Sequence, residues 1–199
     1  SKEIEIEVVQ SEAAKITPTV STAKLSEVPT ENGTITKAED VQKVTEAVSV
    51  PVPEGQAQPR KDLVDNGKVV QGTDQRANGG ANNTGKLVVK VEVTYQDGSK
   101  ETVEVPVEGT DAAKSPLTPP TKVKVNNPNS LTEEEKTAVK EAVKKTNPTL
   151  NDKDISVDEK GKVTVTYPDT STNTLEADKT VEAKTELDKA KEKAKSDLT

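Results

Sequence analysis

The chain has 199 residues and a net charge of −7, and it contains no Cys, His, Met, Phe or Trp. Acidic and basic residues are interspersed, which excludes the concentrated basic face that nucleic acids require and gives no attraction to anionic lipid. No apolar run is long enough to span a bilayer, so no membrane insertion is expected, and without Cys there is neither a disulfide framework nor a thiolate metal site.

Hydrophobic residues make up only 30% of the chain, and two Tyr are its only aromatic residues. The core must therefore be built from Val, Ile, Leu and Ala. Because β-branched side chains pack well on a pleated surface, this composition favours sheets over helices. The chain begins at Ser1 with no signal peptide, so we expect it to be a fragment of a longer protein.

The first residues show a period of two, in which Ile4, Ile6 and Val8 alternate with glutamates. This pattern predicts a strand. The helix-forming residues that follow, 11–15, leave open an alternative, the end of a preceding helical or linker segment. The Thr-, Pro- and Ser-rich stretch 16–34 favours short strands.

The sequence from Thr36 to Glu39 matches a capping box, which predicts a short helix over 37–48 that ends before Pro51 and Pro53. Its apolar positions share one helical face. They are Ala38, Val41, Val44, Ala47 and Val48.

Few hydrophobic residues occur between 54 and 85. Leu63-Val64 and Val69-Val70 are the expected strand centres, and the turn residues 65–68 between them predict a small hairpin. Residues 71–85 form a long polar loop, which is either disordered or the surface that meets a partner. The polar side chains of this loop are the candidate ligand-binding residues. They are Asp74, Gln75, Arg76, Asn78, Asn82 and Asn83.

The chain is organised around a β-hairpin over 85–107, whose turn is formed by Asp97-Gly98. The pattern recurs 72 positions later, so that Tyr167 corresponds to Tyr95. We therefore expect two related modules with one tyrosine anchoring each core. The inward face of the first hairpin is expected to carry Leu87, Val89, Val91, Val93 and Tyr95.

The second half is more regular. A capping box at Ser130–Glu133 predicts a helix over 131–146 that ends at Asn147-Pro148. Short strands are expected before and after it, at 121–125, 155–157 and 163–167. From Asp178 onward, apolar residues recur at helical spacing among Lys and Glu, which indicates a charged helix or a frayed tail. They are Val181, Leu187, Ala190, Ala194 and Leu198.

Together these elements predict a mainly β protein with short helices: a β-sandwich, then a smaller α/β module, then a charged C-terminal helix. The expected β-sandwich domain covers 1–112, and a proline-containing linker covers 113–120. The α/β module covers 121–182. Residues 183–199 form a helical tail or the start of a further module.

The chemistry of an enzyme is hard to build from this composition, because His and Cys are absent and the carboxylates are scattered. We expect no catalysis and no cofactor. Asp152, Asp154, Ser156 and Asp158 could offer oxygen ligands to Ca²⁺, but Val157 occupies the position where such loops need Gly. A solvated strand face explains their spacing better. An intramolecular Lys–Asn isopeptide bond stays open, because it depends on contacts in space.

The sequence VTYQDGSKETVEVPV at 93–107 resembles the ending of Rib-like surface-antigen repeats. The block from Lys124 to Asp169 is similar to a module of streptococcal wall-anchored proteins. Over 85–182 the chain most resembles the non-repetitive ligand-binding region of a serine-rich-repeat fimbrial adhesin of oral streptococci. It contains neither a serine-rich repeat nor a sorting motif.

This resemblance implies an extracellular, cell-wall-anchored adhesion region. Its expected partners are a host glycoprotein or a salivary pellicle component, with self-association and a role in biofilms as further expectations. The alternative is a structural spacer that projects another domain from the cell wall. With 35 carboxylates and no His, the surface charge changes mainly between about pH 5 and pH 4, so acid could alter association.

Overall fold

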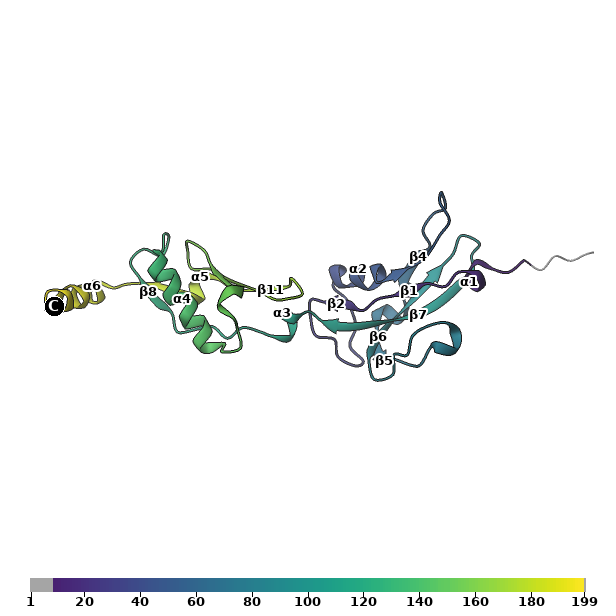
Figure 1. The fold of residues 1–199 in the computed structure, drawn as a ribbon, viewed down its shortest axis with the longest axis horizontal. Coiled ribbons are helices and arrows are strands. Elements are labelled where there is room, and N and C mark those ends of the chain that lie inside the picture. Colours follow the sequence, from purple (N-terminus) through teal and green to yellow (C-terminus); the bar gives the residue numbers. More distant parts are fainter. Residues whose placement is uncertain (1–8, 199) are drawn as a thin grey trace, which may run out of the picture. The chain divides into compact units, whose positions relative to one another are not determined.

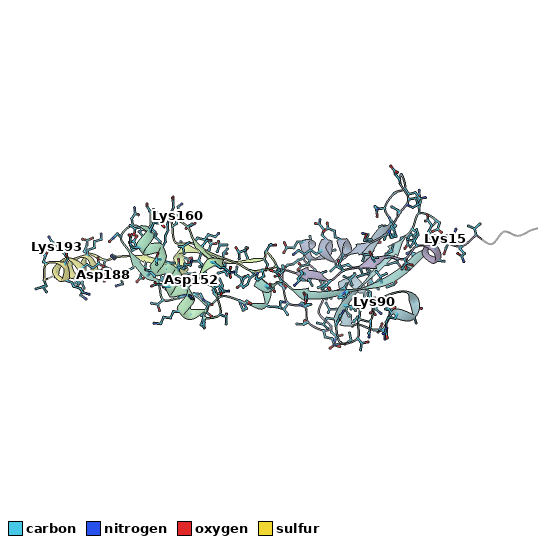
Figure 2. All side chains as sticks on the ribbon, in the orientation of Figure 1. Lys15, Lys90, Asp152, Lys160, Asp188 and Lys193 are labelled. Atoms are coloured by element: carbon cyan, nitrogen blue, oxygen red, sulfur yellow. The ribbon has the colours of Figure 1, made fainter. Side chains whose placement is uncertain are left out.

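The computed structural model describes residues 9–198, and the chain divides into two compact units, 1–113 and 114–199 (Figure 1). The strand predicted at Ile4–Val8 lies outside the described residues. The predicted fold class is confirmed: a β-rich first unit is followed by a smaller α/β unit that ends in a helix. Charged side chains such as Lys15, Lys90 and Lys160 are spread over both units (Figure 2).

The first unit is built on a five-stranded sheet in which β6 is central, and a two-stranded sheet lies beside it. The main sheet has the order β2-β7-β6-β4, with β5 also paired to β6, and β2 runs parallel to β7. Its strands are β2 (Ala23–Leu25), β4 (Arg60–Leu63), β5 (Val69–Gln71), β6 (Leu87–Thr94) and β7 (Lys100–Gly109). The small sheet pairs β1 (Thr19–Val20) with β3 (Val48–Ser49). The helical segments are α1 (Glu12–Lys15), α2 (Ala38–Glu46), η1 (Val64–Gly67), η2 (Arg76–Asn78) and α3 (Asp111–Lys114).

The predicted β6–β7 hairpin is confirmed, with a register that runs from Val88↔Pro106 to Thr94↔Lys100. Its predicted inward face is buried in the core, where Tyr95 is only 4% exposed. Val88, which points to the opposite face, is also fully buried. The outer face of this sheet is therefore covered as well.

The chain around α2 differs from the prediction. The helix begins at Ala38 with Lys37 as N-cap and no side-chain cap, so the predicted capping box at Thr36 is wrong. Instead, buried Asp40 accepts hydrogen bonds from the Ser26 amide and hydroxyl, at 2.8 and 2.7 Å. These bonds tie α2, which contacts β2, β4 and β6, to the chain that follows β2 (Figure 1).

The predicted end of this helix is also wrong, because α2 stops at Glu46. Val48 lies in β3 opposite Val20, so the helix ends where the chain joins the small sheet. Pro51 and Pro53 lie beyond that strand and play no part in ending the helix.

The predicted hairpin around 65–68 is wrong, because β4 and β5 do not pair with each other. Both pair with β6, β4 along Val91–Thr94 and β5 along Leu87–Val89. Asp65 and Asn66 both adopt left-handed backbone conformations, with φ of 50° and 54°. The segment η1 therefore redirects the chain between β4 and β5, so that these two short strands pair one after the other along β6.

The second unit packs α4 (Glu133–Thr146) against β8 (Val123–Val125) and β9 (Ile155–Val157). Antiparallel β9, β10 (Val163–Thr166) and β11 (Thr172–Leu175) form one sheet, and β12 (Val181–Ala183) pairs with β8 in parallel. The remaining elements are η3 (Asp152–Asp154), α5 (Ala177–Thr180) and α6 (Glu186–Ser196). Its core combines Val and Ile from the sheets with Val139 and Val143 of α4.

Three details of this unit correct the prediction. The capping box of α4 lies at Thr132 and Glu135, two residues later than predicted. Val181 belongs to strand β12, so the C-terminal helix begins only at Glu186. Asp152 and Asp154 lie in η3 before β9 rather than on the face of a strand.

The predicted second copy of the hairpin is confirmed in the turn between β10 and β11. The Tyr167 amide donates to the Ser171 carbonyl at 2.9 Å, as the Tyr95 amide does to Ser99. Thr170, with φ of 67°, occupies the place of Gly98. Tyr167 is only partly buried, so it anchors its core less completely than Tyr95 does.

Buried Asn147, which follows α4, is expected to be essential to the second unit. Its Nδ2 donates to the carbonyls of Val143 and Thr118 at 2.8 and 2.9 Å, and its Oδ1 accepts from the Thr118 amide at 2.8 Å. Asn147→Ala leaves these groups without partners and should lower the free energy of unfolding by about 2–3 kcal/mol. Urea titration measures the loss. Asn151→Ala, at an exposed site, is the control, and equal effects of the two variants would contradict this role.

Acid is expected to destabilise the tip of the first hairpin. Asp97 accepts from Ser99 and from the Glu12 amide, the latter at 2.7 Å, and these bonds, the Ser99 hydroxyl first, hold the pKa of Asp97 below its ordinary value. A depressed folded pKa stabilises the fold above the unfolded pKa of about 4, and this contribution disappears as the pH falls through the folded value.

We therefore expect a melting temperature that is constant from about pH 8 to pH 6 and falls below about pH 4. Asp97→Asn should weaken the fall. An acid profile in this variant that overlays the original profile would show that Asp97 contributes nothing to it.

Candidate functional site

The loop between β5 and β6 is folded, so the alternative of a disordered segment is wrong. Isolated bridges join Gly72 to Thr84 and Asp74 to Asn82, and η2 forms its tip. The Gln75 amide donates to the carbonyl of Ala81 at 3.0 Å, which closes the tip on itself. A polar segment thus gains a defined shape from its own backbone.

Buried Glu104 of β7 anchors this loop to the outer face of the sheet. Its carboxylate accepts from the Thr73 amide at 2.9 Å and from the Thr73 hydroxyl at 2.8 Å, and Asn83 Nδ2 lies 3.4 Å away. At Gly72 the loop comes so close that an added Cβ would lie 2.4 Å from the Asn83 carbonyl oxygen and 2.9 Å from Val88. This contact explains why Val88 is buried.

A groove of about 590 Å³ lies between this loop, the segment 17–22 and β7. Its volume is within the usual range of ligand sites. The lining is mixed, with Thr hydroxyls, side-chain amides and a few apolar groups. The groove is lined by Thr17, Pro18, Thr19, Val20, Thr22, Gln75, Asn78, Gly79, Gly80, Ala81, Asn83, Lys86, Glu101, Thr102, Val103, Glu104 and Pro106.

Three of the six candidate residues line the groove: Gln75, Asn78 and Asn83. The other three do not. The Arg76 guanidinium hydrogen-bonds Asp74 at 2.6 Å, and this bond raises the pKa of Arg76 and lowers that of Asp74.

The third residue outside the groove is Asn82, whose side-chain oxygen accepts a hydrogen bond from the Thr84 amide at 3.0 Å. These three side chains shape the loop rather than the groove.

Asn83 has the most distinctive environment in the groove. Its side chain is 2% exposed, and its Oδ1 is one of two buried side-chain atoms without a hydrogen-bond partner in the described part of the chain. A buried amide oxygen without a donor costs about 1–3 kcal/mol. Because this oxygen is buried, the cost belongs to the packing of the loop against the sheet.

Sequence reasoning missed the other walls, above all the Thr residues of 17–22 and the outer residues of β7. The parallel pairing of Ala23 with Val107 brings these distant segments together. The closely spaced Thr17, Thr19 and Thr22 are a visible signal, but their position beside β7 follows only from this pairing.

Two family models match the chain. The Rib domain model matches residues 5–111, and the Atypical Rib domain model matches residues 114–184. The chain belongs to the Rib domain family. The predicted resemblance to Rib-like surface repeats is therefore confirmed, and the groove lies in the Rib domain.

The chain is also similar to streptococcal adhesins, as predicted. The platelet binding protein GspB of Streptococcus gordonii is 41% identical over 76 residues, which are 34% of this chain and 2% of that protein. The chain thus spans only a small fraction of this curated relative.

Solved structures of similar proteins include the SrpA adhesin of Streptococcus sanguinis, at 22% identity and a TM-score of 0.38, over 84% of this chain and 94% of that one. The sialic acid binding region of the Streptococcus sanguinis SK1 adhesin, solved with 3'sLn, has 22% identity and a TM-score of 0.40, over 88% of this chain and 49% of that one.

The groove of the Rib domain is more acidic than basic, because Glu101 and Glu104 line it with Lys86 as the single cationic residue of the lining. Tyr95 reaches Glu101 from the core side and donates its hydroxyl hydrogen to the carboxylate. Burial, followed by the Glu101 hydrogen bond, raises the pKa of Tyr95, so this donor stays protonated at neutral pH. The charges disfavour an anionic ligand.

The described residues 9–198 hold no group of three or more acidic side chains placed to bind a metal ion. Within the same range, no helix is both long and apolar enough to cross a membrane.

Proposed function

We propose that this chain is an adhesion region of a bacterial surface protein, which attaches cells to a host or pellicle glycoprotein through the Rib-domain groove. The observation that supports the proposal best is the groove of about 590 Å³, one wall of which is the folded polar loop between β5 and β6. A groove of this volume beside a folded polar loop is typical of a ligand site. The similarity to a platelet binding protein favours adhesion.

The proposal includes an extracellular position on the bacterial cell wall and no catalytic role. Rib and adhesin domains are typically non-catalytic. In this arrangement the atypical Rib domain supports the Rib domain. The rival function is that of a spacer, in which both domains only project a neighbouring domain. A spacer has no use for a folded polar loop that forms the wall of a groove.

Two tryptophan variants test the groove with little risk to folding. Asn78→Trp places a bulky ring in the groove, whereas Ala77→Trp adds the same ring at an exposed neighbour that does not line it. We expect the first variant to abolish binding of the full chain to immobilised host and pellicle glycoproteins. The second should bind like the original chain. Equal binding by all three proteins would favour the spacer.

We extend the proposal to acid response, self-association and biofilm growth. The chain has 35 acidic and 28 basic residues, so protonation of carboxylates removes its net repulsion. Sedimentation velocity should show more self-association at about pH 4.5 than at pH 7. Identical profiles at both pH values would contradict an acid response.

A further inference from the structure

The edge of β7 that borders the groove has a stretch that pairs with no described strand, in which Thr102 is exposed and Glu104 is buried. Residues 100–106 pair with β6 along one edge, whereas β2 pairs along the other edge only with residues 107–109. Within residues 9–198, no strand pairs with that second edge between 100 and 106. β1 approaches β7 there, but its own pairing is with β3.

The alternation of backbone groups along a strand decides which N–H and C=O groups of β7 face this second edge. The Thr110 amide donates to the Leu25 carbonyl at 2.9 Å, so residue 110 directs its backbone toward the β2 side. Backbone groups alternate between the two edges of a strand, and therefore Thr102 and Glu104 direct theirs to the same side. Pro106 is also an even-numbered residue, so its backbone nitrogen faces away from β6. The missing amide hydrogen of this proline therefore costs no hydrogen bond to β6.

The side chains that line the groove limit the class of ligand that it can bind. The lining includes no aromatic side chain on which a sugar ring could stack, and its two carboxylates face a single lysine. Thr hydroxyls and side-chain amides suit a ligand rich in N–H and C=O groups. An extended polypeptide offers both in alternation, and strand addition is a common mode of peptide recognition.

We propose that the groove binds an extended, unglycosylated stretch of the partner protein, whose backbone pairs with exposed Thr102 at the unpaired edge of β7. This inference rests on the proposed function and specifies which part of a glycoprotein is recognised. The bound stretch carries neutral or basic side chains, because acidic ones would meet Glu101 and Glu104.

Thr102→Pro is the decisive variant. It removes the amide hydrogen that faces the groove, and it leaves the β6–β7 ladder intact because residue 102 has the parity of Pro106. Thr102→Val changes the side chain and keeps the amide, so it is the matched control. Thermal melting of both variants verifies that the fold is retained.

The probe is a library of short, randomised, unglycosylated peptides, from which binders to the full chain are selected and synthesised. Thr102→Pro should weaken binding of these peptides about tenfold relative to Thr102→Val, which loses the same hydroxyl and keeps the amide. N-methylation of the peptide backbone should abolish binding at alternate positions only. Tolerance of N-methylation at every position, or unchanged binding by Thr102→Pro, would overturn the strand-addition mode.

Glycoprotein binding separates this inference from the proposed function. If enzymatic deglycosylation of the host protein abolishes binding and no peptide binds, the peptide mode is wrong while adhesion stands. If neither peptide nor glycoprotein binds, both are wrong. Binding that survives deglycosylation and is lost in Thr102→Pro supports the inference.

Discussion

Tyr95→Ala should strongly destabilise the Rib domain. Its effect should be larger than the effect of any substitution of Tyr167, the corresponding residue, on the atypical Rib domain. The ring of Tyr95 is 4% exposed and belongs to a core that is otherwise aliphatic. Removing it leaves a cavity that small Val and Ala neighbours cannot fill, which costs about 3–5 kcal/mol. Tyr167→Ala should cost less, because Tyr167 is only partly buried.

Hydrogen exchange of the full chain, followed by mass spectrometry, measures the two domains separately. Tyr95→Ala should accelerate exchange throughout β6 and β7 and leave α4 unchanged. Tyr95→Phe keeps the ring and loses only the bond to Glu101, so it should cost about 1 kcal/mol. A loss in Tyr95→Ala no larger than that in Tyr95→Phe would show that packing of the ring is unimportant.

Gly72→Val should both destabilise the Rib domain and abolish binding in the groove. Even the first carbon of a side chain would lie 2.4 Å from the Asn83 carbonyl oxygen, so the loop must leave the sheet. The displacement exposes Val88 and breaks the Thr73–Glu104 bonds, with an expected cost of about 3 kcal/mol.

Gly85→Val is the matched control for this substitution. Gly85 has φ of +81°, but no atom lies within 4 Å of the position of its Cβ, so only backbone strain of about 1–2 kcal/mol is expected. Urea titration and the glycoprotein binding assay are applied to both variants. Retained binding in Gly72→Val would show that the loop can close without this contact.

The sequence predicted those parts of the fold in which local pattern and tertiary structure agree. The β6–β7 hairpin combines strict alternation with an Asp-Gly turn, and α4 ends where Pro148 requires. Predictions failed where a contact with a residue distant in sequence determines the local structure. Ser26, rather than a local cap, hydrogen-bonds Asp40 in the first turn of α2, and Val181 is in a strand because it pairs with Val123.

The same limit applies to the candidate site. The loop was recognised by its polar composition and its length, and half of its nominated side chains line the groove. Glu104 gave no signal, because an acidic residue in an alternating strand indicates a solvated face. It is buried because the loop folds back over that face, a contact between residues 31 positions apart.

The two anchors of the loop have a consequence for how such a protein can diversify. Thr73 and Asn83 hold its ends against Glu104, whereas the tip between them, including Asn78 and Gly79, is exposed. Substitutions in the tip alter the wall of the groove without disturbing these anchors. Under the proposed function, a few such substitutions would change which partner the groove binds while the scaffold stays the same.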